Sequence, residues 1–291
     1  MKFSPDLDPQ LEALISLLDE PDHGSFIKVR DQIFAYGATA VPLLEDAWEN
    51  TFDNSIQQRI EDIIHNIQYD QLFLDLTQWV HYGNDNLLEA YLIFTRYQFQ
   101  SIDQEAIRQQ ISQIRRDIWL ELNDNLTALE KVKVLNHIIY DLHRMQLPLR
   151  QVSEPRYLFL NSLLESRTGY SFALGVLYTM LAQSLDLPVH GVILPGERYV
   201  MAWLDAKGAE NDENARVMFY INPENRGGVF TRNEIAALLK KMKIPAEEKI
   251  FRPVSAKVTL DKFFELLSYL YSSNGDSSRV REIDHLRSAL L

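Results

Sequence analysis

Helical periodicity runs through most of the chain, and strand-like patterning is confined to residues 189–221. Apolar residues recur at helical spacing in residues 9–67 and again in residues 71–150. Residues 260–290 return to the same spacing, and a turn at Asn274-Gly275 predicts that they form a helical hairpin. The sequence therefore predicts an α+β fold that is predominantly helical.

The strand-like stretch divides into three short apolar runs. Residues 189–194 and 199–204 lie on either side of Pro195-Gly196, and this pattern predicts a tight strand–turn–strand unit. Residues 217–221 form a further strand, which Asn222-Pro223 closes. We therefore expect a small sheet that is set among helices.

The segments on either side of this sheet carry typical helix-end signals. Gly169 is a C-terminal cap for the helix that begins near residue 160, and a second apolar helix follows it. Residues 205–216 are charged and predict a loop between strands. Thr231 and Glu234 have the spacing of a capping box and predict the start of another helix.

The first third of the chain is acidic. Residues 1–100 carry 17 Asp and Glu against 5 Lys and Arg, whereas the remaining residues carry 24 of each. Nucleic acids and anionic membranes are disfavoured partners, because both need a basic protein surface. The acidic residues either keep a helical surface solvated or form a docking face for a basic protein, and both interpretations stay open.

The chain has no cysteine, which excludes disulfides, thiolate metal sites and a cysteine nucleophile. No apolar run approaches the ~20 residues that cross a bilayer, and the first residues lack the pattern of a secretory signal. We therefore expect a cytoplasmic protein. His137 and His143 flank Asp141, but six residues turn a helix through about 600° and place the two histidines on different faces, so no metal site is predicted.

Two sets of motifs resemble known families. Residues 29–34, Gly37 and residues 40–44 resemble a HEAT-type helical repeat, although a simple helical cap on the next domain explains them equally well. Over roughly residues 130–291 the chain resembles the SirB-type transglutaminase-like family. The motifs that carry this second resemblance are Leu135-Asn136-His137-Ile138-Ile139-Tyr140, residues 160–169, Leu177-Tyr178, Leu187-Pro188-Val189-His190-Gly191-Val192, Leu194-Pro195-Gly196, Asn222-Pro223 and Gly227-Gly228.

The helical periodicity and the two resemblances together predict four parts along the chain. Residues 1–70 would be the HEAT-like helical region and residues 71–130 a helical connector. Residues 131–245 would form the transglutaminase-like, papain-related α+β core. Residues 246–291 would be a helical hairpin, similar to a shortened tetratricopeptide-like tail.

The same resemblance implies where a catalytic triad belongs. In this fold a helix N-terminus holds a Cys, or a Ser in this family, the next strand a His and the strand after it an Asp or Asn. Alignment on the quoted motifs places these positions at Ala173, Glu197 and Asn222. An alanine methyl cannot attack a carbonyl, so we expect a catalytically degenerate core that needs no cofactor.

The sequence leaves one alternative in which the core is catalytic. Ser171 lies two positions before Ala173 and could act as a displaced nucleophile with His190 as its base. The simpler interpretation is that Ser171 caps its helix, and His190 is then an edge-strand residue. Ser171, Glu197, Arg198 and Asn222 are the residues expected to line the remaining cleft.

These observations predict a protein-binding or regulatory module whose partner is a protein. That partner is basic if it docks on the acidic third, and such binding weakens as salt rises. The alternative function is a hydrolase or acyltransferase that uses Ser171 with His190. The sequence makes no prediction of oligomeric state.

Overall fold

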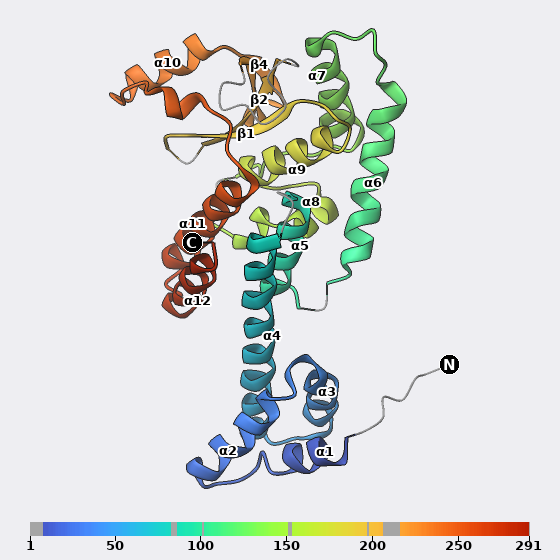
Figure 1. Ribbon diagram of the computed structural model, residues 1–291, viewed down its shortest axis with the longest axis vertical. Helices are drawn as coiled ribbons and strands as arrows, with labels where there is room; N and C mark the ends of the chain where they lie inside the picture. Colours follow the sequence, from blue (N-terminus) through green and yellow to red (C-terminus); the bar gives the residue numbers. More distant parts are fainter. Residues whose placement is uncertain are drawn as a thin grey trace.

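The computed structural model describes residues 8–82, 86–100, 102–150, 153–196, 198–205 and 216–290 (Figure 1). These residues form a predominantly helical α+β protein with one small antiparallel sheet, which confirms the predicted fold class. The α-helices are α1 (Pro9–Ser16), α2 (His23–Phe34), α3 (Val41–Asn50), α4 (Asn54–Tyr82), α5 (Leu87–Gln98), α6 (Gln104–Glu121), α7 (Ala128–Asn136), α8 (Leu160–Ser166), α9 (Ser171–Gln183), α10 (Arg232–Lys241), α11 (Ala256–Ser273) and α12 (Ser277–Ser288). The strands are β1 (Val189–Leu194), β2 (Arg198–Leu204), β3 (Val217–Asn222) and β4 (Gly228–Phe230).

Helix α4 joins the N-terminal helices to the rest of the molecule (Figure 1). Its 29 residues rise through about 43 Å. Ile60, Ile63 and Ile67 pack in one hydrophobic cluster with α1–α3, whereas Leu72 and Leu76 belong to the main core. A single helix therefore runs through the boundary expected near residue 70 and contributes to both clusters.

The sheet has the order β1-β2-β3-β4, and every neighbouring pair is antiparallel. β1 and β2 form the predicted hairpin around Pro195-Gly196, where Gly196 has a φ of +79°. β4 was not predicted, because only three residues pair after the glycine turn. Residues 206–215 of the expected loop lie outside the described residues.

Helices cover both faces of this sheet (Figure 1). Tyr199, Met201 and Trp203 of β2 belong to the main core together with α9. The alternate β2 residues Val200 and Ala202 belong to a smaller cluster with Ile235 and Leu239 of α10, which also includes Phe251. α9 is buried on all sides except at Ser171 and Gln183, as expected of a helix that is apolar all round.

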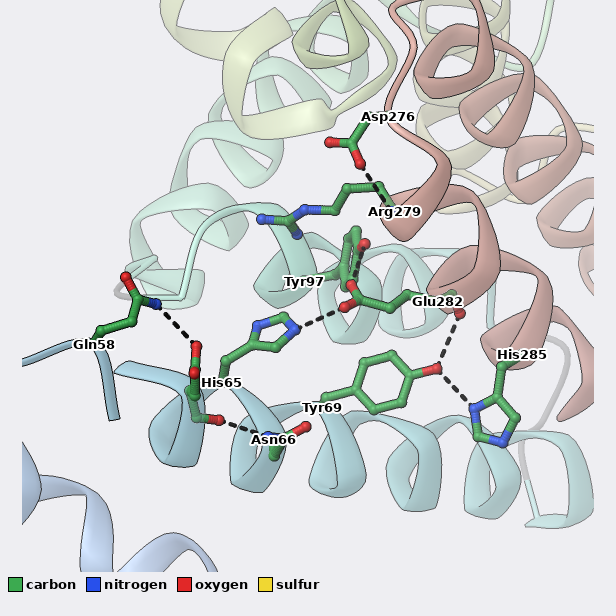
Figure 2. A network of polar contacts seen from close by, with 10 residues as sticks. Gln58, His65, Asn66, Tyr69, Tyr97, Asp276, Arg279, Glu282 and His285 are labelled. Carbon is green, nitrogen blue, oxygen red and sulfur yellow. Dashed lines mark hydrogen bonds and ion pairs between the residues drawn. The ribbon is translucent and has the colours of Figure 1, made fainter. Parts of the chain in front are cut away.

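The C-terminal helices form the predicted hairpin, with a φ of +81° at Gly275. Glu282 of α12 ties this hairpin to α4 and α5, as Figure 2 shows. One of its carboxylate oxygens lies 3.1 Å from Nε2 of His65, and the other accepts a hydrogen bond of 2.8 Å from the hydroxyl of Tyr97. The Glu282 carbonyl accepts a third bond, of 3.0 Å, from the Tyr69 hydroxyl.

This junction predicts a pH-dependent contribution to stability. Hydrogen bonding from His65 lowers the pKa of Glu282 and outweighs the opposing effect of burial. The stabilisation is therefore complete above the unfolded-state pKa of about 4.3 and is lost as the pH falls through the lowered folded-state value. We expect Glu282→Gln to reduce the free energy of unfolding at pH 7. Urea unfolding should show the difference shrinking toward zero below pH 4, and a constant difference down to pH 3 would refute this role.

Candidate functional site

The N-terminus of α9 is the position at which the family resemblance would place an attacking group, and it contains Ala173 and the alternative candidate Ser171. The cap residue is Tyr170, whose side chain makes no capping hydrogen bond, and Ser171 is the first helical residue. The expectation that Ser171 caps the helix is therefore wrong by one position. Its side chain is half-buried, whereas the next eleven residues of the helix are buried.

Ala173 points away from the side of α9 that carries Ser171. A Cβ atom at Gly169 would lie 3.5 Å from the Cβ of Ala173 and 3.1 Å from Cδ1 of Leu163, so Ala173 faces the turn after α8. Two residues of a helix differ in direction by about 160°. Ala173 is also fully buried. The two candidate positions for the attacking atom therefore face different surroundings.

Gly169 has a different role from the one predicted. α8 ends at Ser166, and the left-handed cap residue is Arg167, with a φ of +59°. Gly169 instead lies in a tight space, because a side chain there would come within 3.2 Å of the Tyr157 carbonyl oxygen. A glycine is therefore needed at position 169 because the backbone of Tyr157 approaches closely, and not because a helix ends there.

The side of α9 that carries Ser171 also carries Tyr178, which is seven residues later. Tyr178 is fully buried, and its hydroxyl has no hydrogen-bond partner among the described residues. The same holds for the buried hydroxyl of Tyr140, in the π-helical turn His137–Leu142. Burial raises the pKa of Tyr178, and the nearby Tyr140 raises it further. Both phenols are therefore neutral across the physiological range.

Asn222 ends β3 and opens a tight turn. Its side-chain oxygen accepts a hydrogen bond of 2.9 Å from the Glu224 amide, and its carbonyl accepts one of 2.9 Å from the Gly227 amide. The Asn222 oxygen is therefore already used as the cap of the short 3-10 helix Pro223–Asn225, which packs against α9.

The turn after Asn222 is fixed to the end of α7. Asn136 Nδ2 donates a hydrogen bond of 2.8 Å to the Gly227 carbonyl, and a Cβ at Gly227 would lie 2.7 Å from that same nitrogen. Arg226 donates a bond of 3.1 Å to the Tyr140 carbonyl and forms an ion pair with Asp141. Side-chain contacts therefore hold the turn against the end of α7 and the π-helical segment.

The part of β2 that faces α9 carries no base. Tyr199, Met201 and Trp203 are buried there, and the Tyr199 ring packs edge-on against Phe172 at 5.1 Å between centroids. Burial raises the pKa of Tyr199 to about 12. Its hydroxyl lies 3.4 Å from Oγ1 of Thr179.

The remaining cleft candidates lie near the turn between β1 and β2. Arg198 is half-buried at the start of β2 and pairs with Leu194. Glu197, the predicted triad position, lies outside the described residues.

His190 and Ser171 are not brought together. His190 lies on β1 opposite Ala202, beside a small hollow of about 70 Å³ that Thr179 and Gln183 also line. Thr179 is eight residues after Ser171, which corresponds to about 12 Å along the helix axis. The structure therefore places the proposed base two turns beyond the proposed nucleophile.

The described residues contain no group of three His, Cys, Asp or Glu side chains that could hold a metal ion. His137 lies 3.3 Å from a carboxylate oxygen of Asp141, and His143 lies 2.8 Å from one of Asp117. In the described part of the chain, no helix combines the length and the apolar character needed to cross a membrane.

The sequence pointed to some of these residues without assigning them to the site. Asn136, Tyr140 and Tyr178 all occur in the quoted family motifs, where they read as ordinary helix positions. The signal that could have found them is a polar side chain at a helix position that faces the core. Arg226 gave no such signal, because a charged residue beside two glycines is typical of any exposed turn.

A family comparison agrees with this architecture. The model of the transglutaminase-like superfamily matches residues 105–265, which is more than half of the chain. No curated protein and no solved structure matched the chain. The matched segment includes α9, the sheet and the Asn222 turn, and the chain therefore belongs to the transglutaminase-like superfamily.

Proposed function

We propose that this chain is a non-catalytic member of its superfamily that acts as a protein-binding or regulatory module. The observation that carries the proposal is the surface that β2 presents to α9. Tyr199, Met201 and Trp203 fill it, and none of them can accept a proton from a nucleophile near pH 7. An acyl transfer that begins with a serine hydroxyl needs such a base.

Two further features support the same conclusion. Asn222 uses its oxygen as a turn cap, and Ala173 has only a methyl group against Gly169. Ser171 retains a hydroxyl at the helix N-terminus, but the serine hydroxyl is a weak nucleophile without an adjacent base. His190 lies two turns away, which disfavours the rival hydrolase that would pair it with Ser171.

The finer classification is also part of the proposal. The motifs around Leu177-Tyr178, Leu194-Pro195-Gly196 and Asn222-Pro223 favour the SirB-type group, with a degenerate triad at Ala173, Glu197 and Asn222. The helices before residue 70 are consistent with a HEAT-like docking unit. The cysteine-free composition favours a cytoplasmic location.

The proposal that this chain has no catalytic activity can be tested directly. We expect the purified chain to turn over p-nitrophenyl esters, and a glutaminyl dipeptide with hydroxylamine, no faster than buffer does. Ser171→Ala and His190→Ala should leave this background unchanged. Turnover by the natural chain that either substitution removes would establish the hydrolase instead.

A further inference from the structure

A hollow lies between the N-terminal helices and the α4–α5 pair, away from the transglutaminase-like core. Its inner part, here called the chamber, has a volume of about 290 Å³. Ala38, Val41, Pro42, Ile67 and Leu72 give the chamber a mainly apolar lining. Cavities that hold small-molecule ligands usually have about 300–1,000 Å³, so the chamber suits one or two side chains of a partner better than a drug-sized molecule.

A second hollow, here called the acidic groove, adjoins the chamber. It has a volume of about 450 Å³ and is lined by Glu45, Glu49, Glu61 and Trp48. The two hollows share His65 and Gln100, and therefore meet along α4 and the end of α5. The chamber is therefore a mainly apolar hollow that adjoins an anionic one.

The carboxylates of the acidic groove form no ion pair with the described Lys, Arg and His residues. Within the described ranges, neither Glu45, Glu49 nor Glu61 takes part in an ion pair. Two nearby arginines are engaged elsewhere, since Arg59 donates to the carbonyls of Leu18 and Glu20 and Arg96, in the chamber lining, pairs with Asp75. The groove is therefore electrostatically unbalanced and would attract a cation.

An exposed aromatic ring lies among these carboxylates. Trp48 is 38% exposed, and its Nε1 donates a hydrogen bond of 2.9 Å to Glu61. This bond restrains the indole, and a tryptophan ring is the best aromatic partner for an ammonium or guanidinium group. Carboxylates with a restrained indole are the combination that recognises Lys or Arg.

The chamber is built on fixed helices and carries an unused acceptor. His65 at its edge is tied to Glu282, and Tyr97 in its lining is tied to the same carboxylate (Figure 2). Gln68 also lines the chamber, and its buried Oε1 has no hydrogen-bond partner among the described residues. A buried acceptor without a donor costs stability.

We propose that the chamber and the acidic groove bind a segment of a basic partner protein in which a Lys or Arg stands close to an apolar residue. The cation lies against Trp48 between the glutamates, and the apolar side chain enters the chamber beside Val41. This inference rests on the proposed protein-binding function and names the partner chemistry. Charge complementarity selects the occupant, because an anionic partner would meet three unpaired carboxylates.

The test uses the full chain and a displayed library of random 12-residue peptides. We expect the enriched peptides to place Lys or Arg within three residues of Leu, Met or Phe. A synthetic enriched peptide should bind at least tenfold more weakly to the double variant Glu45→Gln/Glu49→Gln. Val41→Asp, which puts a charge in the chamber, should weaken binding by a similar factor.

The matched control is Glu12→Gln/Asp19→Asn, which removes the same two charges from exposed positions in the same helical region. It should change binding less than twofold. Equal losses in both double variants would mean general electrostatic attraction and would overturn the proposal. Enrichment of acidic peptides, of uncharged peptides or of no peptide at all would also overturn the proposal. So would a dimer of this chain that dissociates in Glu45→Gln/Glu49→Gln and not in the control variant.

These outcomes are independent of the catalytic test. Peptide binding that requires the groove can coexist with ester turnover that requires Ser171, and only the turnover would refute catalytic silence. Absence of selective peptide binding, with no turnover, would leave the core non-catalytic and would reject the groove as the docking site.

Discussion

A cysteine at position 171 is expected to react with Ellman's reagent at least ~100-fold faster than a cysteine at position 173. Ser171 is half-buried at a helix N-terminus, which favours the thiolate, whereas Ala173 is fully buried against Gly169 and Leu163. The natural chain has no cysteine, so each variant contains a single thiol and the absorbance change has no background from the protein. The measurement is the rate of thionitrobenzoate release from Ser171→Cys and Ala173→Cys at several pH values.

Unfolding in guanidinium chloride supplies the control, because both thiols should then react at one common rate. A faster reaction at position 173 in the folded proteins would show that position 173 is the more accessible of the two, and equal rates would show that the two positions do not differ; either result would contradict the prediction. The proposed absence of a base predicts a second result for Ser171→Cys. Its thiol should be modified by the reagent without gaining turnover of p-nitrophenyl esters.

Gly191→Ala is expected to lower the free energy of unfolding by about 3 kcal/mol and the Tm by about 6–12 °C. A Cβ at Gly191 would overlap the Tyr199 hydroxyl and lie 2.5 Å from Cζ of that ring. The ring cannot move aside, because it is buried and packs between Phe172 and Gly175. Overpacking of the interface between β1 and α9 is therefore unavoidable.

A double-mutant cycle separates this clash from other effects of the substitution. Tyr199→Leu shortens the side chain, so the combined variant Gly191→Ala/Tyr199→Leu should be more stable than the sum of the two single changes predicts. Gly24→Ala is the control, since its nearest neighbour would be Asp22 Oδ2 at 3.4 Å, and it should cost less than about 1 kcal/mol. Additive effects in the cycle would mean that Tyr199 is not what Gly191 accommodates.

The sequence predicted elements whose signals are local. The hairpin around Pro195-Gly196 and the capping box at Thr231 and Glu234 depend on turn and cap chemistry within a few residues, and both are confirmed. The turn at Asn274-Gly275 belongs to the same class. The superfamily was also identified from motifs, because the motifs are short and can be read without knowing which distant residues are in contact.

The site was less predictable because it depends on direction and on distant contacts. Helix periodicity predicts that Ser171 and Ala173 point in opposite directions. Which of the two directions is fully buried depends on how α9 packs against its neighbours, and this packing is not a local property of the sequence. Asn136 donates a hydrogen bond to Gly227, which lies 91 residues later in the chain, and no local sequence pattern predicts this contact. Tyr170, rather than Ser171, precedes the first helical turn, and a one-residue shift of this kind is within the usual uncertainty of helix ends.

The continuity of α4 has a consequence for how this protein can be divided. A fragment that began near residue 71 would start halfway along a helix, and one that ended there would leave the second half of that helix without its C-terminal packing. A fragment that kept all of α4 but lost α1–α3 would expose Ile60, Ile63 and Ile67 to water. The acidic helices are therefore not a detachable appendage, and α4 fixes their distance and angle to the transglutaminase-like core.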